Sequence, residues 1–429
     1  MPRLDKTRIS MYDLLICLTD ASDLISHEVA YHHQQVAYLA YRIAVHMDLP
    51  VEQQKNLMLA GLLHDVGAFS LEERLSLTEE ETPNSNDHAF RGARLLEGFS
   101  PLSSAAEIIR YHHVPWMDGE GSRFAGKEVP FLSHVLHLAD RIAVSINRNE
   151  NVIDQIGAIR DKISSQRNAI FPSEPLDAFL EISGREYIWL DMTYKPLMYL
   201  LPEIMTFDVV ELDLDQMIDL THIFANIIDF RNPFTAKHSA GVARTAEKLA
   251  ALAGFSENEC KMMLIAGYLH DLGKLAVSKS ILNKPAALNS EEYNVIRSHT
   301  FYTYRLLQKI RGFETINQWA SFHHEKLNGK GYPFHLEDSD IPLGSRIMAV
   351  ADIFTAITED RPYRAGLPAG RVRAILQSMV KDHSLCPYVV SLLMENFDMI
   401  NQARQKAQRR ASADYRYITE PDSHIRKEK

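Results

Sequence analysis

The feature that most constrains the fold of this chain is an internal duplication. The segment "HHQQVAYLAYRIA" (32–44) matches "HSAGVARTAEKLA" (238–250), and each segment begins with a histidine that precedes a His-Asp pair by 32 residues. Further matches follow in the same order along both halves, including "YHH" at 111–113 with "FHH" at 322–324. Repeats of this length indicate a duplicated domain rather than a short-period solenoid.

Each copy has the periodicity of helices. Val242, Ala246, Leu249 and Ala250 recur at steps of three and four residues, which is the amphipathic helical pattern. Ser290 is a suitable N-cap for a helix that starts with two glutamates. Pro and Gly gather between the helical segments, and strand-like alternation is scarce. The sequence therefore predicts an all-α protein built from two tandem helical bundles.

The duplication also predicts the domain boundaries. We expect an N-terminal domain over 1–205, a C-terminal domain over 206–402 and a polar tail over 403–429. Residues 148–205 are apolar enough to pack as helices of the first domain. The tail is polar and charged, with almost no residues suited to a core, which is typical of a solvated or disordered end.

Composition excludes several classes of protein. The net charge of −10 gives no support to binding of a nucleic acid polymer. Cys17, Cys260 and Cys386 show no CxxC spacing, so a disulfide framework is not expected and a cytoplasmic location fits. No run of about eighteen apolar residues is present, so we predict no membrane span.

Ligand-type side chains stand at apolar helical positions of the second copy. A single core histidine usually bonds to a backbone carbonyl, but several such residues matched by a second copy favour a metal site. Nitrogen and oxygen ligands without thiolates suit Fe, Mn, Zn, Ni or Co. Their number exceeds what one ion needs, and a metal pair bridged by a carboxylate would use all of them. The set is His238, His270, Asp271, His299, His323, His324 and Asp352.

The order H…HD…H…HH…D resembles the HD superfamily of metal-dependent phosphohydrolases, which has an all-helical fold. The second copy resembles, from about residue 220 to 400, the HD-GYP subfamily of bacterial cyclic-dinucleotide phosphodiesterases. It contains both "HDLGKL" from His270 and the triplet Gly331-Tyr332-Pro333. Several separate segments agree with this pattern, so the resemblance is specific.

The resemblance implies a role for each ligand. One metal would be held by His238, His270, Asp271 and Asp352, and Asp271 would bridge to the second metal. The second metal would be held by His299, His323 and His324. Iron or manganese is favoured, with nickel, cobalt and zinc as alternatives. A hydroxide that bridges the metals would attack the phosphodiester and give a linear dinucleotide, with mononucleotides as a further product.

Substrate contacts are also implied by the resemblance. Lys274 would act with Asp271 in catalysis and stabilise the charge on the phosphoryl oxygens; its alternative role is a solvated lysine at a helix end. The Gly-Tyr-Pro loop would contact a guanine base, and two arginines would bind phosphates unless they form only structural salt bridges. The expected substrate contacts are Lys274, Gly331, Tyr332, Pro333, Arg361 and Arg364.

Two positions depart from the family pattern. Phe234 replaces a glutamate that holds a third metal in some relatives, so we predict two metals in this copy. Asn328 replaces an aspartate before the first glycine of the Gly-Tyr-Pro loop, where Asn supports the same turn conformations.

The first copy keeps the ligands but lacks the substrate-binding residues. Ala68 stands where the second copy has Lys274, and no Gly-Tyr-Pro or "RPYR" sequence is present. We expect this domain to bind a metal, and a nucleotide, and to act in regulation or dimerisation; the alternative is a vestigial core whose polar residues bond to each other. Its candidate ligands are Glu28, His32, His64, Asp65, His88, His112, His113 and Asp140.

The sequence thus predicts a hydrolase for a bacterial cyclic dinucleotide, either cyclic di-GMP or 3'3'-cyclic GMP–AMP. Two other functions remain open: a catalytically silent scaffold that binds a cyclic dinucleotide, and an HD phosphohydrolase for mononucleotides. Expected partners are the dinucleotide and either a second copy of the chain or a signalling protein.

Overall fold

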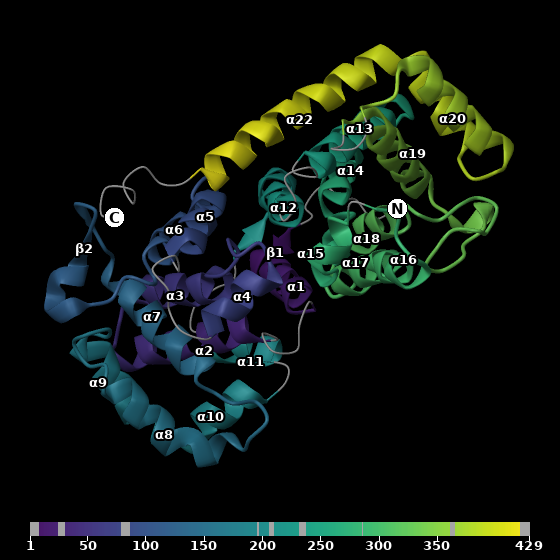
Figure 1. The fold of residues 1–429 in the computed structure, drawn as a ribbon. Coiled ribbons are helices and arrows are strands. Elements are labelled where there is room, and N and C mark those ends of the chain that lie inside the picture. Colours follow the sequence, from purple (N-terminus) through teal and green to yellow (C-terminus); the bar gives the residue numbers. More distant parts are fainter. Residues whose placement is uncertain are drawn as a thin grey trace. The chain divides into compact units, whose positions relative to one another are not determined.

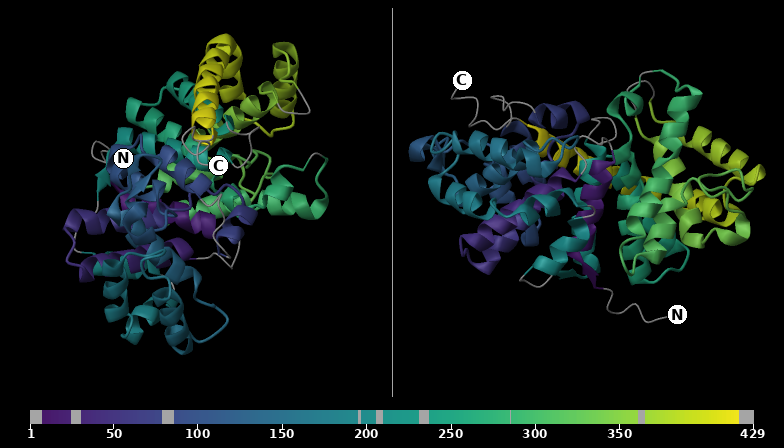
Figure 2. Two further views of the ribbon diagram at one scale, coloured as in Figure 1. Left: turned by 60° about the vertical axis from the view of Figure 1, so that its left-hand side comes forward. Right: turned by 90° about the horizontal axis from the view of Figure 1, so that it is seen from below.

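The computed structural model describes residues 8–24, 31–78, 86–194, 197–205, 210–230, 237–284, 286–360 and 365–420. Among these residues the only paired strands are two short antiparallel pairs, β1 with β4 and β2 with β3. All larger elements are helices, as Figures 1 and 2 show. The predicted all-α fold is therefore confirmed.

The chain divides into two compact units. We call the unit of residues 26–209 and 418–429 the N-terminal domain, and the unit of residues 1–25 and 210–417 the C-terminal domain. The expected boundary near 205 is close to the observed one. The prediction that residues 1–25 belong to the N-terminal domain is wrong, because β1 and helix α1 pack within the C-terminal domain.

Helices α2, α3 and α7 form the centre of the N-terminal domain, and the segment between 148 and 205 adds further helices to it, as predicted. Helices α2 and α3 approach so closely that a Cβ atom on Gly61 would lie 2.5 Å from the Cα atom of Ala37. The elements are α2 (His32–His46), α3 (Val51–Leu63), α4 (Leu71–Thr78), α5 (Asn86–Leu96), α6 (Ser103–Arg110), β2 (Arg123–Phe124), β3 (Lys127–Glu128), α7 (Phe131–Val144), α8 (Val152–Ser164), α9 (Ser173–Ile182), α10 (Glu186–Thr193) and α11 (Leu197–Ile204).

Helices α13, α14 and α19 form the centre of the C-terminal domain. The close approach of α2 and α3 recurs here, since a Cβ atom on Gly267 would lie 2.4 Å from the Cα atom of Ala243. The elements are β1 (Ile9–Ser10), α1 (Met11–Asp23), β4 (Glu211–Leu212), α12 (Leu214–Asp229), α13 (His238–Leu252), α14 (Glu257–Leu269), α15 (Lys279–Leu282), α16 (Ser290–Arg297), α17 (His299–Leu307), α18 (Glu314–Ser321), α19 (Leu343–Thr358), α20 (Ala369–Lys381), α21 (Pro387–Glu395) and α22 (Phe397–Thr419).

Local sequence signals set several helix starts in this domain. Ser256 and Glu259 form a capping box at the start of α14, in which each side chain accepts a bond from the other residue's backbone N–H. Helix α16 begins in the same way, but its N-cap is Asn289 and not the predicted Ser290. The error is one residue, because Asn289 is an equally good cap.

The described part of the polar segment, residues 403–420, is not a disordered tail. It forms most of α22, the long yellow helix of Figure 1, and residues 403–417 belong to the C-terminal domain. Ile400, Arg404, Gln408 and Ala411 are buried, at spacings of three and four residues. Two of these four side chains are polar, which explains why the apolar periodicity was too weak to predict a packed helix.

No helix in the described part of the chain is both long and apolar enough to cross a membrane.

Candidate metal centre

Most of the predicted ligands of the C-terminal domain come together from the ends of its helices. His238 is the first residue of α13, His270 directly follows α14, and His299 is the first residue of α17. Asp352 lies within α19, while His323 and His324 follow the end of α18. Helix ends suit a cluster of ligands because several helices of the bundle can converge there without interrupting helical hydrogen bonds.

Short distances join these side chains into one cluster. His238 Nε2 lies 3.2 Å from Asp352 Oδ1. The two oxygens of Asp271 face different histidines: Oδ2 lies 3.2 Å from His270 Nε2, and Oδ1 lies 3.4 Å from His299 Nε2. Three sets have ligand atoms within 4.8 Å of one another: His238 with His270 and Asp352, His299 with His323 and His324, and His270 with Asp271 and His323.

Backbone carbonyls fix the orientation of three imidazoles. Nδ1 lies 2.8 Å from Gly267 O in His270, 2.6 Å from Ile296 O in His299 and 2.6 Å from Ala320 O in His323. Because a carbonyl can only accept, each Nδ1 donates, and the lone pair of each Nε2 points into the cluster. This is the arrangement of metal-binding histidines.

Two atoms of the cluster have no hydrogen-bond partner among the described residues. They are His270 Nε2 and Asp271 Oδ1, both fully buried. A buried polar atom without a partner is costly, and a divalent cation would satisfy both atoms. The donor set therefore fits the predicted metals.

The electrostatics favour the metal-binding protonation states of Asp271, His299 and His324. Burial lowers the pKa of His299 to about 3 and that of His324 to about 4, so both imidazoles are neutral at pH 7. Burial alone would raise the pKa of Asp271, but His270 and Lys274 outweigh it and hold that pKa well below its usual range. The Asp271 carboxylate is thus ionised and the His299 and His324 imidazoles are neutral, as metal ligation requires. His238 differs, because burial alone would lower its pKa but Glu359 and Asp352 outweigh burial and raise that pKa well above its usual range.

Lys274 contacts the cluster directly. Its Nζ lies 2.5 Å from Asp271 Oδ2, and its side chain is 28% exposed. Burial lowers the pKa of Lys274, but Asp271 raises it by more, so the net pKa is raised and the amine is charged. The sequence left open a solvated lysine at a helix end, and this contact places the charge at the cluster instead.

The Gly-Tyr-Pro loop lies beside the histidine pair. The ring centroids of Tyr332 and His324 are 4.9 Å apart, and the Tyr332 amide donates to His324 O at 3.2 Å. A Cβ atom on Gly331 would lie 2.4 Å from the Cα atom of Glu325, so no larger residue fits there. Glu325 is buried and accepts from the amides of Phe334 and Leu336, which holds the loop in place.

Arg361 and Arg364, the predicted phosphate-binding arginines, lie outside the described residues, as does Phe234.

Sequence reasoning missed several residues around the cluster. Glu359 is buried, and its carboxylate lies 3.3 Å from His238 Nδ1, so it orients this ligand. Gln408 of α22 donates to Glu359 at 3.2 Å. Arg297 stacks over the Tyr332 ring at 4.9 Å. The one sequence signal for Glu359 was its spacing, because it lies seven residues, or about two helical turns, after Asp352.

Asp229 was also missed. It is buried at the end of α12 and accepts from both Ser239 N (2.9 Å) and Ser239 Oγ (3.0 Å). Burial raises the pKa of Asp229 to about 7. This carboxyl group ties the start of α13, and so His238, to α12.

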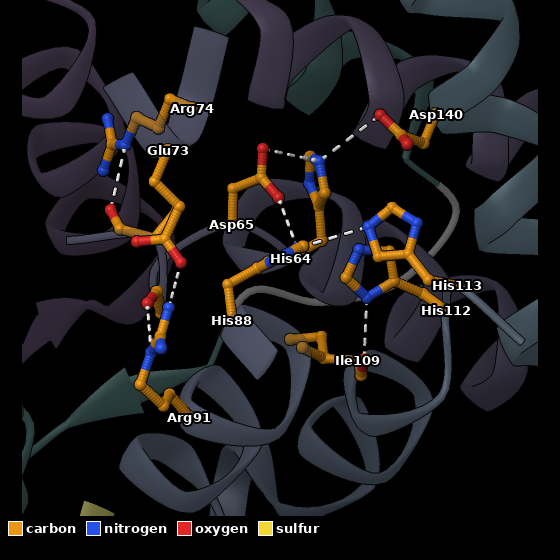
Figure 3. Close-up of polar contacts among 12 residues, drawn as sticks. His64, Asp65, Glu73, Arg74, His88, Arg91, Ile109, His112, His113 and Asp140 are labelled. Carbon is orange, nitrogen blue, oxygen red and sulfur yellow. Dashed lines mark hydrogen bonds and ion pairs between the residues drawn. The ribbon is translucent and has the colours of Figure 1, made fainter. Parts of the chain in front are cut away.

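The N-terminal domain holds a second cluster of the same type (Figure 3). Asp65 again faces two histidines, with Oδ1 3.1 Å from His88 Nε2 and Oδ2 3.3 Å from His64 Nε2. His32 Nε2 lies 3.0 Å from Asp140 Oδ1. Two candidate metal-binding sets result: His32 with His64 and Asp140, and His88 with His112 and His113. Glu28 lies outside the described residues.

The surroundings of this second cluster differ. Ala68 is buried and brings no charge, and its carbonyl accepts from Arg74 Nε at 3.2 Å. Arg91 Nε donates to Gly67 O at 2.9 Å and pairs with Glu73 (Figure 3). Arg141 binds the second carboxylate oxygen of Asp140 at 2.5 Å. The arginines near this cluster thus bond to the protein itself.

Comparisons with known proteins agree with this duplication. Family models described as "HD domain" match residues 222–385 and residues 29–145. The 3'3'-cGAMP-specific phosphodiesterase 1 of Vibrio cholerae is 29% identical over 400 residues, which cover 90% of this chain and 92% of that protein. The cyclic di-GMP phosphodiesterase response regulator RpfG of Xanthomonas campestris is 37% identical over 142 residues, 33% of this chain and 38% of that protein.

A solved structure shows the same fold. The crystal structure of a cyclic GMP–AMP specific phosphodiesterase of Vibrio cholerae, V-cGAP3, matches with a TM-score of 0.64 and 21% identity. The match covers 91% of this chain and 98% of that chain. The tandem arrangement of two helical bundles is therefore found in a protein of known structure.

Proposed function

Because the chain belongs to the HD-domain family and contains two HD domains, we propose that it is a metal-dependent phosphodiesterase that hydrolyses a bacterial cyclic dinucleotide. The leading substrate is 3'3'-cyclic GMP–AMP, since the relative aligned over nine-tenths of this chain is named for that molecule. Cyclic di-GMP is the second candidate, since RpfG, whose printed name gives that substrate, is 37% identical over a shorter segment.

The position of Asp271 carries the proposal. Its two oxygens face His270 and His299, which belong to different candidate metal-binding sets. We propose that His238, His270 and Asp352 would hold one ion, that His299, His323 and His324 would hold the other, and that Asp271 would serve both. Iron or manganese is the favoured metal, with nickel, cobalt and zinc as alternatives.

Bound divalent ions would supply Lewis acidity toward the phosphodiester. The residues of the chain supply the rest. Lys274 places a positive charge beside Asp271, where it stabilises negative charge that develops on the phosphoryl oxygens. Tyr332 stands against His324, where its ring can stack with a base of the substrate. Asp271 and Lys274 are the proposed catalytic residues, and the linear dinucleotide is the proposed first product.

Two alternatives are less well supported. A silent scaffold has no need of Lys274 at 2.5 Å from the central carboxylate. A mononucleotide phosphohydrolase has no need of the Gly-Tyr-Pro loop, which is held beside His324. Both features fit hydrolysis of a cyclic dinucleotide.

We propose a regulatory or dimerisation role for the N-terminal domain. It keeps a complete His/Asp cluster and lacks both Lys274 and the Gly-Tyr-Pro loop. A homodimer or a signalling protein as partner, and the cytoplasmic location expected from the cysteines, stay predictions.

A product assay tests the function. Purified full-length protein is incubated with Mn²⁺ or Fe²⁺ and with 3'3'-cyclic GMP–AMP, cyclic di-GMP or dGTP, and the products are separated by chromatography. We expect linear dinucleotide from a cyclic substrate, no product from dGTP and no product after chelation. Release of product from dGTP alone would support the mononucleotide phosphohydrolase, and binding without any product would support the scaffold.

A further inference from the structure

The C-terminal domain contains a cavity of about 500 Å³ that includes none of the cluster ligands. Helices α12, α13, α14 and α22 line it, and Figures 1 and 2 show where these helices run. Its volume is in the range of small-molecule sites, about 300–1,000 Å³. The polar side chains that line it and matter here are His222, Arg244, Lys248, Tyr268, Lys406 and Arg410.

Positive charge dominates the lining. Four cationic side chains and one carboxylate, Asp219, face the cavity. Arg244 and Lys248 share Glu247, at 3.3 and 3.5 Å. Lys406 and Arg410 of α22 form no ion pair with the described residues. These two cations are therefore available for the phosphates of a ligand.

An aromatic pair occupies another part of the lining. The rings of His222 and Tyr268 have centroids 5.2 Å apart and planes inclined by 52°. Ile218 and Leu264 add apolar surface beside them. Planar rings next to apolar side chains suit a nucleobase, which binds by stacking.

The cavity and the metal cluster lie on opposite faces of the same two helices. Ala240 lines the cavity two residues after His238 on α13, and Tyr268 lines it two residues before His270 at the end of α14. Two residues turn a helix by about 200°, so these side chains point away from the cluster. A ligand of the cavity is thus distinct from a substrate at the cluster.

We propose that this cavity is a second nucleotide-binding site, with the base against Tyr268 and His222 and the phosphates on Lys406 and Arg410. The ligand class is a nucleoside di- or triphosphate, whose charge matches the pair of cations on α22.

A chain of buried contacts links this site to the cluster. Lys406 and Arg410 lie on either side of Gln408 along α22, and Gln408 donates to Glu359 at 3.2 Å. Glu359 in turn contacts His238 Nδ1 at 3.3 Å. A ligand that shifts α22 would therefore change how His238 is held, and the site regulates hydrolysis. This regulatory part rests on the proposed function, whereas the binding site does not.

Equilibrium binding of a fluorescent GTP analogue to the full-length protein tests the site. We expect the double variant Lys406→Glu/Arg410→Glu to weaken binding at this site by more than about tenfold, since two charged contacts are reversed. The matched control is Arg409→Glu, which changes an exposed arginine of the same helix that does not line the cavity. The control should bind like the wild type.

Equal binding of the GTP analogue by all three proteins, or binding by none of them, would overturn the proposed nucleotide-binding site. For the regulatory part, GTP is added to the hydrolysis assay. We expect the rate of the wild type to change by about threefold or more, and the double variant to show its basal rate without a response. Hydrolysis without GTP tests the proposed function separately, and bound GTP with no change in rate would overturn regulation alone.

Discussion

The two domains keep the same cluster and differ in what surrounds it. In both, a central aspartate faces two histidines, and a glycine lets the two ligand-bearing helices approach closely. The C-terminal domain adds Lys274 and the Gly-Tyr-Pro loop, whereas the N-terminal domain has Ala68 and an arginine bound to Asp140. We therefore propose that metal binding and substrate binding depend on separate sets of residues in this fold, and that the C-terminal domain has both sets.

The second aspartate of each cluster shows the same contrast. Arg141 binds Oδ2 of Asp140. The residue that follows Asp352 in the C-terminal domain is Ile353, which has no charge. Burial would raise the pKa of Asp140, but Arg141 and the histidines hold it well below its usual range. Part of the charge of this carboxylate is thus neutralised by the protein, which leaves less of it for a metal.

The largest expected effect separates the two central aspartates. Asp271→Asn should lower the rate of cyclic-dinucleotide hydrolysis by about a thousandfold, because it removes the carboxylate whose two oxygens face His270 and His299 in the proposed metal site. Asp65→Asn, the matched change in the N-terminal domain, should alter the basal rate by less than about threefold. The measurement is the initial rate with saturating Mn²⁺. An equal loss in both variants would mean that both clusters are catalytic.

Substitution of Lys274 tests its proposed role in stabilising charge on the phosphoryl oxygens. Lys274→Ala should lower kcat by about a hundredfold, since it removes a charge that acts on the transition state. Bound metal should stay near the wild-type amount, because the charged amine of Lys274 has no lone pair to offer a metal. The control Lys279→Ala, a nearby lysine with no contact to the cluster, should be neutral. Loss of metal together with activity would assign Lys274 a structural role instead.

Glu359 tests the support that His238 receives at its Nδ1 atom. Glu359→Gln should weaken metal binding in that domain by about 10- to 100-fold, the usual cost of removing a residue that orients a histidine ligand. The measurement is a metal titration in which the metal bound by each of the two domains is determined separately. Glu291→Gln, an exposed glutamate, serves as the control. Unchanged affinity in Glu359→Gln would show that His238 needs no such support.

The smallest expected effect is the pH dependence that Asp229 adds to the C-terminal domain. Burial raises the pKa of Asp229 from 3.8 to about 7. Between these values the folded domain keeps a proton on Asp229 that the unfolded chain loses, so the contribution of Asp229 to the free energy of unfolding falls as pH rises from 4 to 7. His299 and His324, whose pKa values burial lowers to about 3 and about 4, contribute with the opposite sign. Urea unfolding of chelated protein should therefore show a free energy of unfolding that increases more with pH in Asp229→Asn than in the wild type. The same pH dependence in both proteins would show that Asp229 does not titrate in this range.

Much of the cluster could be predicted from the sequence because its signals are local and repeated. The His-Asp pair, the histidine 32 residues before it and the later His-His pair occur in both copies at apolar positions. The structure brings the described ligands of each copy together, with Asp65 placed by its contacts to His64 and His88. Helix ends place these residues, and helix ends have their own sequence signals.

The sequence alone determined the helical class, the duplication and the ligand types, since each follows from short-range periodicity or from repetition along the chain. Only the tertiary structure decided that α1 belongs to the C-terminal domain, that α22 packs, and that Gln408 reaches Glu359 and Glu359 reaches His238. The physical reason is that a polar side chain can be buried only when a distant partner satisfies it. Residues 359 and 238 are 121 positions apart, so no local pattern records their contact.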